Sequence, residues 1–180
     1  MAQFKAFAPG VEVNGESVLS VVAGVPGSET MAKQILASCG IADPQPGKWY
    51  PQQAWLDAFK TLADEVGPRT LLNIGKAIPE NAQWPPTVNS IDTALPSINM
   101  AYHMNHRGGD IGTYGYQKTG DRGAKMVCRN PYPCQFDQGI IMSAAKRFKP
   151  ADVVAVNVTH DESAPCRAKG GDSCTYLVAW

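Results

Sequence analysis

The sequence lacks most of the short signatures by which enzymes and nucleotide-binding proteins are recognised. It contains no Gly-x-Ser-x-Gly turn, no phosphate-binding loop and no dinucleotide fingerprint. It has no Cys-x2-Cys pair, which excludes a zinc ribbon, and no catalytic dyad stands out. We therefore expect a binding module rather than an enzyme.

Long apolar runs are also absent. No stretch of 18 or more apolar residues occurs, so no membrane span is predicted, and residues 1–5 lack the apolar core of a signal peptide. These absences predict a cytoplasmic, reducing location. Five cysteines there are more typical of a metal or catalytic site than of disulfides. In an exported protein we would instead expect two disulfides and one free thiol.

The chain has no excess charge of either sign. Lys plus Arg count 16 and Asp plus Glu count 16, whereas a nucleic-acid binder usually carries a clear basic excess. We therefore expect no nucleic-acid partner, and we interpret the locally basic residues 118–149 as a solvated face. A length of 180 residues with 44% hydrophobic residues predicts one domain, 1–180, with a helical layer over 1–107 and a sheet region over 108–180.

The first half has the periodicity of helices. Ser28 is the predicted N-cap of a helix that ends at Gly40, and a second helix begins at Pro51. A third is predicted over 69–78, stopped before Pro79, and a fourth over 90–105 with Pro96 inside it.

The second half reads as strands around one helix. Residues 113–117 and 124–129 predict a hairpin, 137–148 a helix, and 153–159 and 174–180 two further strands. The expected fold class is therefore α+β, with the helical half packed on an antiparallel sheet of about four strands in the order hairpin, helix, hairpin.

The last 50 residues hold the side chains best suited to a metal. Cys166 and Cys174 lie at the two ends of a Gly-rich hairpin loop, Glu162 lies just upstream, and Cys134 precedes the predicted helix. Thiolates and a carboxylate in tetrahedral array suit zinc. The alternative interpretation is that these cysteines are small core residues.

From Gly112 to Trp180 the sequence resembles the 4-vinyl reductase-like small-molecule-binding domain. The resemblance rests on a Pro-rich turn, Cys134, Gly139 five residues later, a Val-rich strand, and then Glu162, Cys166, a Gly-rich loop and Cys174. That family shares its fold with heme nitric-oxide-binding domains and with TRAPP-type Golgi transport subunits. The resemblance implies a small-molecule sensor domain of the kind found in bacterial activators.

In the phenol-sensing members of that family zinc is held by a Cys before the helix, a Glu and two hairpin cysteines. By resemblance these ligands are Cys134, Glu162, Cys166 and Cys174. Seven residues separate the last two, as in the family. Three residues separate Glu162 from Cys166 where those sensors have two, so Cys128 or His160 could replace Glu162.

Heme is the second cofactor that the resemblance raises. A helix histidine ligates the iron in heme-binding relatives, which makes His103 the formal candidate. The Tyr-x-Ser-x-Arg motif that grips the heme propionates has no counterpart here, where the sequence reads Asn130-Pro131-Tyr132-Pro133. We therefore expect that heme is unlikely.

In this fold the ligand lies between the helical layer and the sheet. Met and aromatic side chains form adaptable walls for a small hydrophobic or aromatic molecule, although each is also an ordinary core residue. The candidate ligand-binding residues are Trp84, Met100, Tyr102, His103, Tyr114, Tyr116 and Phe136. We expect a homodimer that signals to a separate output protein. The alternatives are a tetrapyrrole-binding protein or vinyl reductase accessory, and a protein–protein interaction module.

Overall fold

A computed structural model describes residues 3–25, 27 and 29–180. Its larger sheet has the strand order β4-β5-β7-β6, with every neighbouring pair antiparallel. The strands are β4 (Thr113–Gly120), β5 (Gly123–Arg129), β6 (Asn157–His160) and β7 (Cys174–Ala179). The predicted antiparallel sheet of four strands is confirmed.

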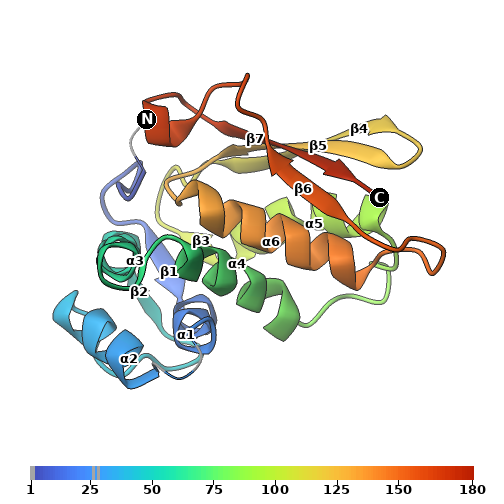
Figure 1. Ribbon diagram of the computed structural model, residues 1–180. Helices are drawn as coiled ribbons and strands as arrows, with labels where there is room; N and C mark the ends of the chain where they lie inside the picture. The colour runs from blue at the N-terminus through green and yellow to red at the C-terminus, as the bar shows by residue number, and fades with distance from the viewer. Residues whose placement is uncertain (1–2, 26, 28) are drawn as a thin grey trace.

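The helices lie on one side of this sheet, as Figure 1 shows. Helix α6 (Cys134–Arg147) runs beneath the sheet, and α4 (Arg69–Asn81) packs along α6. Helix α5 (Ile91–Met104) contacts β4. The remaining helices are α1 (Gly15–Ala23), α2 (Glu29–Ser38) and α3 (Gln52–Val66), and a short 3-10 helix, η1, covers Arg167–Lys169. Within the described residues, no helix has both the length and the apolar character needed to cross a bilayer.

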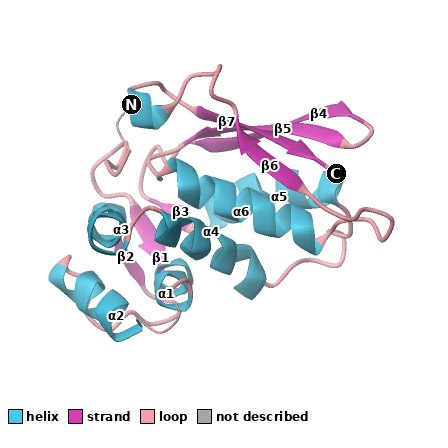
Figure 2. Ribbon diagram, in the orientation of Figure 1, coloured by secondary structure: helices cyan, strands magenta, loops and turns pink. Residues whose placement is uncertain are grey.

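A second sheet joins distant parts of the first half (Figure 2). It has three short strands in the order β2-β1-β3, namely β2 (Trp49–Pro51), β1 (Glu12–Asn14) and β3 (His106–Arg107). The sequence analysis predicted neither this sheet nor α1. Strands of two or three residues are too short to show an alternating pattern, so sequence periodicity does not reveal them.

Helices α4 and α6 approach each other unusually closely. A Cβ atom added to Gly139 of α6 would lie 2.3 Å from the backbone oxygen of Leu72, and one added to Gly75 of α4 would lie 2.1 Å from that of Phe136. Real Cβ atoms do not come so close to backbone atoms, so each glycine is required by the contact. This pair of glycines fixes α6 against the helical half.

Several predicted boundaries were wrong. Helix α4 continues through Pro79 to Asn81, although the proline cannot donate a hydrogen bond to the preceding turn. Its ring is buried, so packing carries the helix past the proline. Of the strand predicted over 153–159, only residues from 157 onward form a strand, β6. The residues before it do not, since Val153 N–H bonds Pro150 O in a turn and the side chain of Val154 is 96% exposed. Ser28 lies outside the described residues.

Helix α6 begins at Cys134, three residues earlier than predicted. Pro133 is its N-cap residue, with an extended backbone, so the helix begins directly after it. The sulfur of Cys134 is therefore placed at the N-terminal end of α6, and Asp137 lies buried within the first turn.

Candidate metal centre

Four metal-binding side chains meet at one end of the large sheet. The three sulfur atoms and a ring nitrogen all lie within 4.8 Å of one another, and the residues are Cys134, His160, Cys166 and Cys174. The S–S distances are 3.3 Å for Cys134–Cys174, 3.7 Å for Cys134–Cys166 and 4.0 Å for Cys166–Cys174. Two thiolates on one tetrahedral zinc ion are about 3.8 Å apart, given Zn–S bonds of about 2.3 Å. The sulfur positions are therefore suited to zinc.

Each of the four donors comes from a different part of the chain. Cys134 begins α6, His160 ends β6, Cys166 precedes η1 and Cys174 begins β7. Strands β6 and β7 are adjacent, with His160 paired to Tyr176. The hydroxyl of Tyr176 donates to the backbone oxygen of Cys134 at 2.7 Å, which ties the start of α6 to β7.

A tight turn presents the sulfur of Cys166. The backbone oxygen of Cys166 accepts from the N–H groups of Lys169, at 3.0 Å, and Gly171, at 2.9 Å. A Cβ atom on Gly171 would lie 2.8 Å from the backbone nitrogen of Cys166. Gly170 has φ 86°, in the left-handed region that favours glycine. Gly170 and Gly171 thus allow the tight turn that holds Cys166 in place.

His160 has one ring nitrogen engaged and one without a partner. Its Nδ1 lies 3.0 Å from Oε1 of Glu162, whereas its Nε2 is buried and has no hydrogen-bond partner among the described residues. With the proton on Nδ1, as this contact indicates, Nε2 carries a free lone pair. Metal-bound histidines have this arrangement, in which a carboxylate fixes the tautomer and the other nitrogen ligates.

Glu162 itself does not join the four donors. Its carboxylate is exposed and bonds Nζ of Lys169 at 2.7 Å as well as His160. The ion pair with Lys169 and the contact with His160 lower the pKa of Glu162 to about 2. Cys128 also lies outside the group of donors. Of the two alternatives to Glu162 considered from the sequence, the structure places His160 with the three cysteines.

The thiols of Cys134 and Cys174 share a proton unequally. The hydrogen-bond contact with the sulfur of Cys134, at 3.3 Å, lowers the pKa of Cys174, and the positive charge of Arg167 acts in the same direction. The same contact raises the pKa of Cys134. All five cysteines of the chain lie in the described part, and they are free thiols, so no disulfide competes for these sulfurs.

A buried polar network adjoins Cys174. The guanidinium of Arg167 bonds the carboxylate of Asp137 and the side-chain and backbone oxygens of Asn130. The hydroxyl of Tyr114 donates to the same carboxylate at 2.5 Å. Sequence analysis overlooked Arg167, because an arginine that follows a cysteine has no periodic or motif signal of burial.

The predicted ligand-binding residues do not form one pocket. Tyr102, Tyr114 and Phe136 are buried in the core, where Tyr102 and Phe136 pack on Tyr132 and Tyr114 packs on Tyr102. The others lie elsewhere: Met100 is 64% exposed, His103 is exposed on α5, Tyr116 bonds Asp92, and Trp84 packs on Phe148. Only the three buried aromatic residues are brought together.

His106 is the buried histidine of this aromatic cluster, and sequence analysis did not select it. Its Nε2 lies 2.6 Å from the hydroxyl of Tyr132, which also accepts from Nε2 of Gln52, and its Nδ1 lies 2.9 Å from Tyr102 O. Burial lowers the pKa of His106 to about 4. The imidazole is therefore neutral at pH 7. Two buried polar atoms nearby, Oε1 of Gln52 and Nε1 of Trp55, have no partner among the described residues.

Replacing His106 by glutamine is expected to reduce the loss of stability, measured as the free energy of unfolding, that the wild type suffers below pH 6.5. The folded pKa is about 4 and the ordinary value is 6.5, so between these values the unfolded chain binds a proton that the folded chain does not. The free energy of unfolding of the wild type is therefore unaffected by protonation of His106 above pH 6.5. It falls by up to about 3 kcal/mol as the pH falls toward 4, because the unfolded chain then gains a proton on this imidazole. Urea unfolding of both proteins from about pH 7.5 down to about pH 4 measures this difference. Parallel profiles would contradict it.

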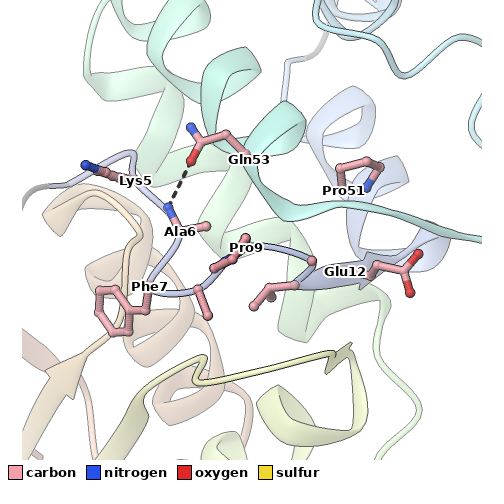
Figure 3. Close-up of a pocket in the computed structure, with 10 residues that line it drawn as sticks. Lys5, Ala6, Phe7, Pro9, Glu12, Pro51 and Gln53 are labelled. Atoms are coloured by element: carbon pink, nitrogen blue, oxygen red, sulfur yellow. Dashed lines mark hydrogen bonds between the residues drawn. The ribbon is translucent and has the colours of Figure 1, made fainter.

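The two surface hollows described lie away from the predicted ligand-binding residues. The larger, about 640 Å³, runs between residues 5–12 and the start of α3 (Figure 3). Figure 3 shows Gln53 bonded to the backbone of Ala6 at its edge, at 3.0 Å. The second, about 460 Å³, lies between α4 and α6. Neither contains any of the seven predicted residues.

The fold is that of H-NOX domains. One such structure, from S. oneidensis in the Fe(II)NO state, has a TM-score of 0.66 at 12% identity over 91% of this chain and 97% of that one. The T. tengcongensis H-NOX has a TM-score of 0.64 at 14% identity, over 92% and 94%, and the K. algicida protein 0.65 at 11%, over 92% and 95%. No model of a known family and no curated protein matches the chain. The fold expectation is thus confirmed, whereas assignment to the 4-vinyl reductase-like family is not.

The expectation that heme is unlikely is contradicted by this comparison. Two of the structures with this fold were determined to study heme: one concerns the redox potential of heme under porphyrin distortion, and the other concerns heme distortion in the H-NOX family. In this chain, however, both ring nitrogens of His106 have partners, and the rings of Trp55, Tyr102, Tyr132 and Phe136 pack against one another around it.

Proposed function

We propose that this chain is a small-molecule-binding sensor module whose sheet region is held together by one zinc ion. The ligands are Cys134, His160, Cys166 and Cys174. The observation that carries the zinc proposal is the convergence of three thiols and an unpartnered imidazole nitrogen, all within 4.8 Å of one another in the described part of the chain. A buried polar atom without a partner is costly, and a metal ion would satisfy it.

Four protein ligands indicate a structural role. A catalytic zinc site keeps a position for water or substrate, whereas a site with three cysteines and one histidine is closed. Zinc there would neutralise charge on the sulfurs and link α6, β6, η1 and β7. The free energy of metal binding would add to that of folding, because the donors come from four separate elements.

The sensor part of the proposal is supported by the fold and by the aromatic core. The likeness to H-NOX structures extends over more than 90% of the chain. Tyr102, Tyr114 and Phe136 come from α5, β4 and α6 and are buried together in the core, so a small hydrophobic or aromatic molecule would contact them only when the core opens to admit it. A homodimer and a separate output protein remain parts of this proposal.

The test is the metal content of protein purified without chelator or affinity metal. We expect native mass spectrometry to show one zinc ion per chain. His160→Ala should lose the ion, because it removes a ligand. Glu162→Gln should keep it with about 10- to 100-fold weaker affinity, as is typical when a group that orients a ligand is changed.

Two results would count against this assignment. A wild-type mass without metal would contradict the zinc proposal as a whole. Retention of zinc by His160→Ala together with its loss from Glu162→Gln would show that the glutamate is the ligand and the histidine is not.

A further inference from the structure

Arg167 is an unusual residue to find in the interior of a protein. Only 2% of it is exposed, and it is among the largest fully buried side chains. Arginine is almost never so buried unless it is paired. All three guanidinium nitrogens have partners: Nη1 bonds Asn130, Nη2 bonds Asp137, and Nε donates to the sulfur of Cys174 at 3.4 Å.

The contact with Cys174 is made twice. The backbone N–H of Arg167 also donates to the same sulfur at 3.4 Å. Gln3 also donates to a sulfur of the candidate metal centre: its Nε2 lies 2.8 Å from the sulfur of Cys134. Cys174 is therefore the sulfur that receives both a fixed positive charge and two N–H donors.

Charge balance gives this contact a purpose. Three thiolates and a neutral imidazole around Zn²⁺ carry a net charge of −1, and Cys174 is fully buried. Water cannot solvate that charge at Cys174, so the two N–H groups and the guanidinium of Arg167 must stabilise it. Arg167 and Asp137 together are neutral, because Nη2 pairs with the carboxylate, and it is the Nε–H group that contacts the sulfur. Asp137 and Asn130 hold the guanidinium in place and do not touch the sulfur themselves.

We propose that Arg167 is a positioning residue of the metal centre, which holds the Cys174 thiolate through its Nε–H and its charge. This inference rests on the proposed zinc site. Removal of Arg167 should leave the sulfur a stronger electron donor and more reactive, because an N–H donor withdraws charge from a thiolate. A residue that only filled space would change neither property.

The test uses the full chain with cobalt(II) as the probe metal and three variants. Arg167→Gln removes the charge, Arg167→Lys keeps it, and Gly139→Ala destabilises the fold at the contact of α6 with α4, away from the sulfurs and from Arg167. For Arg167→Gln we expect the thiolate-to-cobalt absorption band to move to longer wavelength. Zinc affinity, measured against a competing chelator, should fall about 10- to 100-fold.

The controls separate positioning from stability. Arg167→Lys should restore most of the zinc affinity, and it also provides the measurement if Arg167→Gln does not fold. Gly139→Ala should lower the melting temperature with little change in the cobalt band. If the wild type binds cobalt and zinc but both arginine variants match its spectrum and affinity, the role of Arg167 is refuted and the metal site stands. If the wild type binds neither metal, the proposed zinc site itself is refuted.

Discussion

Cys166→Ala and Cys174→Ala are each expected to lose bound zinc and to melt at a much lower temperature. Each change removes one ligand of four and leaves two thiols and a histidine that hold zinc poorly. The stabilisation that bound metal gives to the folded state is then lost. A loss of several kcal/mol in a domain of this size lowers the melting temperature on the order of 10–20 °C.

Cys39→Ala is the matched control for these two variants. Cys39 is a half-buried free thiol that lies outside the group of donors. It should melt within a few degrees of the wild type. Chelator should lower the melting temperature of the wild type and of Cys39→Ala but not that of the ligand variants. Calorimetry with and without chelator measures both effects, and equal melting of all four proteins would remove the zinc proposal.

Gly139→Ala should destabilise the fold without touching the metal centre. The added methyl would lie 2.3 Å from the backbone oxygen of Leu72 and 2.9 Å from the backbone nitrogen of Lys76, so α4 and α6 must separate. Overpacking of this kind costs about 1–3 kcal/mol or more, which lowers the melting temperature on the order of 5–10 °C.

Gly120→Ala provides the comparison, because a Cβ atom there has no neighbour within 4 Å among the described residues. The melting temperature of Gly139→Ala should lie below that of Gly120→Ala by most of the drop expected for Gly139→Ala. Both variants should keep their zinc. Equal melting temperatures would mean that the helix pair tolerates the methyl group, which would contradict the close approach described.

The strand half of the fold was the more predictable part of the sequence. Residues 113–129 alternate and are interrupted by turn residues, and they form β4 and β5 as expected. The strand predicted over 153–159 failed at its start, because residues 153–156 have the composition of a strand but pair with no strand of the described chain. Pairing is a tertiary property that local pattern does not contain.

Three of the four side chains that meet at the candidate metal centre were selected from the sequence. Cys134, Cys166 and Cys174 stand out because thiols are rare and chemically distinct. His160 was considered only as an alternative, since the choice between it and Glu162 depends on which side chain β6 turns toward the sulfurs. His106 and Arg167 were not selected, because their burial depends on partners far away in the sequence.

The strand order of the large sheet also dictates an order of assembly. Within the described chain, β6 pairs with β7 alone, and β7 separates β6 from β5. When residues 157–160 leave the ribosome they have no strand to join until residues 174–179 follow. Because contacts between distant residues form slowly, insertion of β7 is expected to be the late step of folding. Cys174 lies on β7, so the group of four candidate donors is complete only after that step.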